Sequence, residues 1–126
     1  MGLPPSVPAP KASAHARVKA LRVGLSKEPD ARLRAALAFE LAALTEQRLE
    51  DRAGALQIFR EARDHDPLFR PVLYALARLL AGTREFDELA RVLASTVSAS
   101  TLPAERAAAL VGLGCAMLVG MRRRFA

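Results

Sequence analysis

Apolar residues recur every three or four positions along most of this chain, which is the spacing of one face of an α-helix. This pattern predicts helices over residues 13–27, 31–47, 69–81, 85–97 and 103–122. Strand patterns are absent, because the chain has no alternating Val, Ile and Thr runs and no Asn-Gly or Asp-Gly turn. The expected fold class is therefore all-α.

One more helix is predicted in the middle of the chain, where the pattern is clearest. Ala55 is followed by Phe59 four residues later and by Ala62 after three more, so the three share one helical face. Pro67 ends this helix, because a proline pushes the residue before it out of the α region. Asp30 is the expected N-cap of the helix that starts at residue 31.

The predicted helices fall into consecutive pairs, each made of a first and a second helix. Three first helices share an apolar pattern, and the distance from Leu41 to Leu76 is 35 residues and from Leu76 to Leu113 is 37. Two second helices are related by 34 residues, from Ala55 to Leu89. The first-helix pattern reads Ala38-x2-Leu41-Ala42-x2-Thr45, Leu73-x2-Leu76-Ala77-x2-Leu80 and Leu110-x2-Leu113-Gly114-x2-Met117, and the second-helix pattern reads Ala55-x3-Phe59-x2-Ala62 and Leu89-x3-Leu93-x2-Thr96.

This order and period resemble the tetratricopeptide repeat, a helical hairpin of about 34 residues. The resemblance implies a right-handed superhelix of about six helices in three hairpins over residues 13–126. Residues 1–12 are Pro-rich and lack apolar periodicity, so a disordered tail is predicted there. The family's Trp is missing and its Tyr position holds Thr45, Leu80 and Met117, which leaves a more general helical-hairpin solenoid open. The implied repeat-defining residues are Leu41, Ala42, Ala55, Phe59, Ala62, Pro67, Leu73, Leu76, Ala77, Leu89, Leu93, Leu110, Leu113, Gly114 and Met117.

Proteins of this family bind other proteins, and the resemblance implies that a peptide or partner helix lies on the concave surface made by the first helices. Tyr74 and Arg78 are the strongest candidates, since Tyr and Arg are enriched at binding hot spots. Phe39 is equally well explained as a core residue, because a shift of one position would turn it inward. The full set of partner-binding candidates is Phe39, Ala43, Glu46, Tyr74, Arg78, Val111 and Cys115.

The net charge of +6 lies at the two ends of the chain. Residues 1–27 carry +5, residues 28–103 carry −2 and residues 104–126 carry +3. A nucleic-acid-binding domain usually carries its basic stripe on the folded part, with aromatic residues for stacking. Nucleic acid is therefore an unlikely partner on this pattern.

The last predicted helix suggests an alternative function, that of a membrane-associated helical protein. Residues 107–121 carry no charge and are mainly apolar, and Arg122, Arg123 and Arg124 follow them. A basic flank next to an apolar helix is typical of membrane-associated segments. The run is shorter than the roughly 20 residues that span a bilayer, so a buried helix is the favoured interpretation.

On the repeat alignment, Ala126 falls where the next second helix would begin. We therefore expect the array to be truncated, or to be completed by self-association through its unpaired last helix.

A third possible function is that of an accessory subunit that positions an enzyme.

No motif for chemistry is found. His65 lies between two Asp residues, but adjacent helical residues do not share a face, and no other His or Cys stands at ligand spacing. Cys115 is the only cysteine and has no His near it in the sequence. We expect no catalysis, metal or cofactor. The single cysteine and the lack of a signal peptide predict a cytoplasmic protein.

Overall fold

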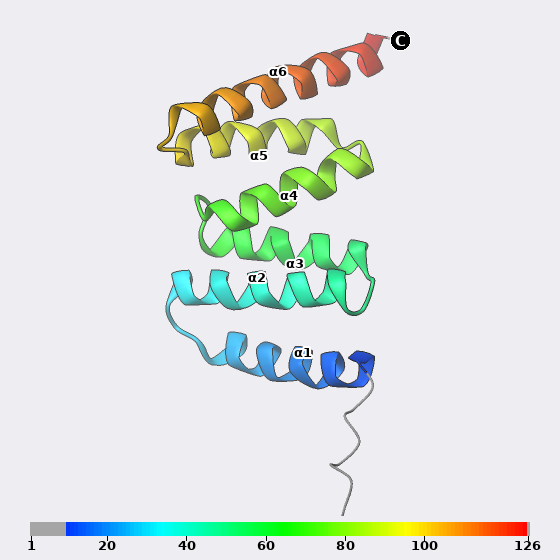
Figure 1. The fold of residues 1–126 in the computed structure, drawn as a ribbon, viewed down its shortest axis with the longest axis vertical. Coiled ribbons are helices and arrows are strands. Elements are labelled where there is room, and N and C mark those ends of the chain that lie inside the picture. The colour runs from blue at the N-terminus through cyan, green and yellow to red at the C-terminus, as the bar shows by residue number, and fades with distance from the viewer. Residues whose placement is uncertain (1–9, 126) are drawn as a thin grey trace, which may run out of the picture.

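The computed structural model describes residues 10–125, with side chains from 13 to 123, and over this range the chain forms six α-helices and no strand (Figure 1). This confirms the all-α prediction. The helices are α1 (Pro10–Lys27), α2 (Ala31–Gln47), α3 (Arg52–His65), α4 (Arg70–Thr83), α5 (Phe86–Ala99) and α6 (Pro103–Phe125).

Several predicted helix boundaries differ from the structure by one to three residues. The first helix begins at Pro10 rather than at residue 13, because proline's fixed φ suits the first helical position. Residues 10–12 of the tail predicted at 1–12 belong to α1, and residues 1–9 lie outside the described residues. The first two residues of the loop expected at 98–101 are helical, since α5 continues to Ala99. The Ser100 hydroxyl donates a hydrogen bond of 2.7 Å to the Thr96 carbonyl and so satisfies the end of that helix.

An aspartate is the N-cap of each helix of the first hairpin, which is made of α2 and α3. The Asp30 carboxylate accepts a hydrogen bond of 2.9 Å from the Arg32 backbone N–H, as predicted. The Asp51 carboxylate accepts one of 2.9 Å from the Gly54 N–H at the start of α3. These bonds satisfy backbone donors that have no partner inside the helix.

The six helices stack in sequence order as a ladder one helix deep (Figure 1). Successive helices are joined at alternate ends, so neighbours run antiparallel. Extensive packing occurs only between consecutive helices, with the largest contact between α2 and α3. The apolar core runs from α2 to α6, which contributes Ala116. Its largest fully buried side chains are Phe59, Leu41, Leu73, Leu76, Leu80, Val72 and Val92.

Most of the repeat-defining residues lie in this core. In α2, α3, α4 and α5 the equivalent positions are buried, with Ala77 and Leu93 half-buried at its edge. Pro67 is exposed just after the end of α3. The residues buried at these positions are Leu41, Ala42, Ala55, Phe59, Ala62, Leu73, Leu76 and Leu89.

The third first helix, α6, departs from this rule. Leu110, Gly114 and Met117 are exposed, and Leu113 is half-buried, so the expectation that all four belong to the core is wrong for the first three. The reason is that α6 packs against fewer helices than α2 and α4 do. Helices α2 and α4 each pack between two others, whereas α6 packs extensively against α5 alone. Its inner side is made of small residues, Ala109, Gly112, Ala116 and Gly120.

Candidate functional site

Glu46 on α2 and Arg78 on α4, two predicted partner-binding residues, bind each other. The Arg78 guanidinium donates hydrogen bonds of 2.6 and 2.7 Å to the two Glu46 carboxylate oxygens. This hydrogen bonding with Arg78 lowers the pKa of Glu46 below its ordinary value, although partial burial opposes the change. The carboxylate is 12% exposed, so its charge is satisfied inside the molecule before any partner arrives.

Phe39 packs among aromatic rings. Its ring centroid lies 5.7 Å from that of Phe59 and 6.1 Å from that of Phe69, in tilted and edge-on arrangements. Such geometry is favourable for aromatic pairs. The half-buried ring therefore agrees with the core interpretation of Phe39.

Tyr74 on α4 remains 45% exposed and lines a groove between α4, α5 and α6. The groove has a volume of about 490 Å³, and its walls are mostly apolar. Its one charged wall residue, Glu105, forms an ion pair with Arg70, with a closest N–O distance of 3.5 Å. The other lining residues are Ala77, Leu93, Thr96, Ala108 and Ala109.

The exposed side of α6 is rich in large apolar residues. Of the eleven large apolar residues that are strongly exposed, six lie on this helix. At 3.6 residues per turn, four of its residues form one stripe with spacings of four, three and four positions, and two more flank it. We call this surface the α6 face; its stripe is Leu110, Gly114, Met117 and Met121, and its flank is Val111 and Leu118.

Two further properties of α6 bear on what covers this face. By length and composition, Pro103–Arg123 is apolar enough to cross a membrane. Only 11% of its most apolar stretch is buried. At its C-terminal end Arg122 is exposed, and the Arg123 guanidinium lies 5.9 Å from the ring centroid of Phe86. The Arg124 side chain lies outside the described residues.

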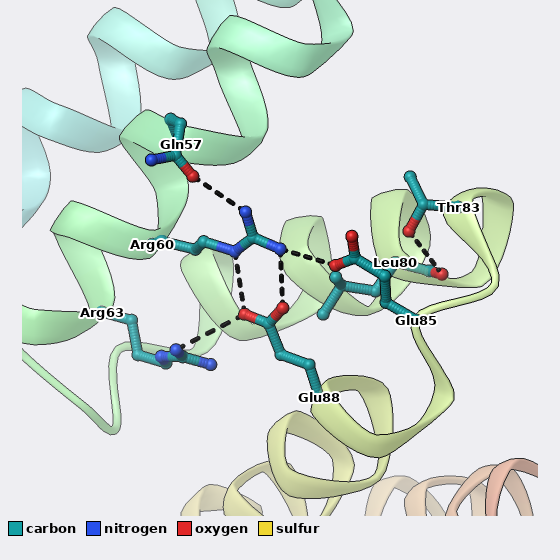
Figure 2. Close-up of polar contacts among 7 residues, drawn as sticks. All are labelled: Gln57, Arg60, Arg63, Leu80, Thr83, Glu85 and Glu88. Carbon is teal, nitrogen blue, oxygen red and sulfur yellow. Dashed lines mark hydrogen bonds and ion pairs between the residues drawn. The ribbon is translucent and has the colours of Figure 1, made fainter. Parts of the chain in front are cut away.

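A cleft of about 850 Å³ lies between α3 and α4, and its walls combine apolar residues with the charged side chains of Arg60, Arg78 and Glu85. Figure 2 shows how Arg60 is held there: it binds Glu88 through two hydrogen bonds, Glu85 through one and Gln57 through one. Four of the five guanidinium donors are thus used. Arg60 and Arg78 of this cleft are therefore held in ion pairs, with Glu85 and Glu88 and with Glu46 respectively.

Cys115 lies exposed on α6 beside Val111, another predicted partner-binding residue, which is 68% exposed. Among the described residues, no group of three or more His, Cys, Asp or Glu side chains comes close enough to hold a metal ion.

Sequence reasoning missed the exposure of Leu118 and Met121. A signal was present: residues 107–121 lack polar residues on every face, although a helix at the surface normally has a polar side.

No family model, curated protein or solved structure matches this chain. The tetratricopeptide resemblance therefore remains a prediction that depends on the internal repeat and its burial.

Proposed function

We propose that this protein is a protein-interaction module built from stacked helical hairpins, similar in plan to a tetratricopeptide array, and that the α6 face binds its partner. The observation that carries the proposal is the uncharged, outward-facing surface of residues 107–121. At 1.5 Å per residue it is about 22 Å long. Contiguous exposed apolar surfaces of this kind mark interaction sites on soluble proteins.

The hairpin plan is supported by burial at equivalent positions. Leu41 in α2 and Leu76 in α4 are both fully buried, and so are Ala55 in α3 and, to 7% exposure, Leu89 in α5. These pairs stand 35 and 34 residues apart. Equivalent positions of successive hairpins are therefore buried alike, as in repeat proteins.

The same observations move the proposed contact away from Arg78. A partner acid would have to displace Glu46 from a bidentate pair, which costs more than meeting a free arginine. Leu118, in contrast, is 66% exposed and gains from being covered. Tyr74 and its groove border the same helix and provide a second contact region.

The test is site-specific photo-crosslinking. A photoreactive amino acid replaces Leu118 on the α6 face or, as a control, Leu33, which is 52% exposed on α2. In an extract of the cells that make this protein, we expect discrete protein adducts from position 118 only, and we expect Met117→Asp to abolish them. Equal adducts at both positions, or none at position 118, would overturn the proposal.

Membrane association is the second candidate, and one observation favours it. Only 11% of the most apolar stretch of α6 is buried, whereas the core helix of a soluble protein is mostly covered. Arg122 lies at the end of this helix, where it would meet the anionic headgroups of a bilayer. Flotation with anionic liposomes separates the two functions. Flotation that persists at high salt and is abolished by Met117→Asp would support the membrane.

A further inference from the structure

We infer that the partner docks on the α6 face as an amphipathic α-helix, antiparallel to α6, with apolar residues at four- and three-residue spacing and acidic residues at its N-terminal end. This inference rests on the proposed function and names the class of partner.

The ladder itself shows what covers an equivalent face. Position by position, Leu110 of α6 corresponds to Ala38 of α2 and Leu73 of α4. Those two are 0% and 1% exposed, whereas Leu110 is 53% exposed. Both α2 and α4 have a following antiparallel helix, α3 or α5, packed beside them, and α6 has none among the described residues.

The shape of the stripe suits a helix. Spacings of four, three and four residues place Leu110, Gly114, Met117 and Met121 in a narrow seam, which is the arrangement that receives the side chains of a second helix. Gly114 adds a gap in the middle, because even a Cβ placed there would meet no atom within 4 Å. A large side chain of the partner would fit over this gap.

Both helices that cover such seams share two features. Their buried residues follow one spacing, Ala55, Phe59 and Ala62 in α3, and Leu89, Leu93 and Thr96 in α5, with Leu93 half-buried. Each also begins with acids, Asp51 as the N-cap of α3 and Asp87 with Glu88 in the first turn of α5.

Charge sets the orientation. Arg122 is exposed at the C-terminal end of α6. An antiparallel helix places its N-terminal turn there, so acids in that turn meet this arginine as well as their own helix dipole. A parallel helix would place the same acids at the other end of α6, away from Arg122, and only the partial negative charge of its carbonyl end would face this arginine.

The experiment uses the full 126-residue protein and a synthetic peptide that copies residues 50–67, which contain α3. Binding is measured by fluorescence anisotropy of the labelled peptide and, independently, by an environment-sensitive dye on Cys115, the only cysteine. We expect saturable binding that Leu110→Asp weakens at least tenfold. Leu33→Asp, at a site of matched exposure, should leave it unchanged. A peptide carrying Phe59→Asp should not bind.

Orientation is read by disulfide trapping. In a protein with Cys115→Ser and Met121→Cys, a peptide with an added N-terminal cysteine should form the disulfide faster than one with an added C-terminal cysteine. The reverse order would overturn the antiparallel arrangement.

The other occupants are outcomes of the same test. Absence of saturable peptide binding, or equal binding by Leu110→Asp, overturns the inference. Dimerisation in sedimentation velocity that Leu110→Asp abolishes, without peptide binding, assigns the face to a second copy and also overturns it. Flotation with liposomes, without peptide binding, assigns the face to a bilayer and overturns the inference as well. If crosslinking at position 118 captures a protein while the peptide fails, the proposed function stands and this inference alone falls.

Discussion

Arg60 on α3 and Glu88 on α5 form a bidentate ion pair that ties together two helices with α4 between them in the sequence. The Arg60 Nε donates to one Glu88 oxygen at 2.9 Å and its Nη2 to the other at 2.7 Å (Figure 2). The two side chains are 29% and 14% exposed. A partly desolvated fork of this kind is stronger than an ordinary surface pair and fixes the geometry of the partners. It therefore holds the second hairpin at a set position on the first.

A double-mutant cycle measures this pair. We expect Arg60→Ala and Glu88→Ala each to lower the free energy of unfolding, with a coupling energy of about 1–2 kcal/mol between them. Urea denaturation of the four proteins gives the value. Arg91→Ala, an exposed arginine of α5, is the control and should change stability by about 0.5 kcal/mol or less. A coupling energy near zero would show that the two side chains do not interact in solution.

The ion pairs also predict how stability depends on pH. Hydrogen bonding to Arg60 lowers the pKa of Glu88, and hydrogen bonding to Arg78 lowers the pKa of Glu46, in each case from an ordinary value of 4.5. A carboxyl group with a lowered pKa in the folded state stabilises the fold above its ordinary pKa. That stabilisation is lost as the pH falls below 4.5 through the lowered folded value.

The measurement is the free energy of unfolding between pH 7 and about pH 3. Glu88→Gln and Glu46→Gln should each be less stable than the wild type at pH 7 and should show a shallower decline towards acid pH. Glu40→Gln, at an exposed position of α2, should keep the wild-type profile. An unchanged slope in both ion-pair variants would contradict the assignment.

The sequence predicted the helices and the core because both depend on local periodicity. Leu41, Phe59 and Leu76 lie at spacings that only a helix brings to one face, and all three are buried. The Arg60–Glu88 pair joins residues 28 positions apart, and its formation depends on how the two hairpins are set against each other. No pattern along the chain carries that information.

The exposed α6 face was missed for a related reason. Leu110 and Met117 have the spacing of core residues, and spacing reports which side of a helix is apolar. Whether that side is covered depends on the neighbouring helix, which is a property of the tertiary structure. The groove residues follow the same rule, because Tyr74 is exposed while Phe39, its equivalent in α2, packs against two rings.

The contrast between Leu73 and Leu110 gives a direct test of this difference. The two residues occupy the same repeat position, but their side chains are 1% and 53% exposed. Leu73→Ala removes a packed side chain from the core and should lower the free energy of unfolding by about 2–5 kcal/mol. Leu110→Ala removes a side chain already in water and should cost about 0.5 kcal/mol or less, in part because alanine is the stronger helix former. Urea denaturation of both variants distinguishes the cases. An equal loss of stability would mean that the α6 face is already packed in the free protein, and no surface would then remain for the helix that we propose.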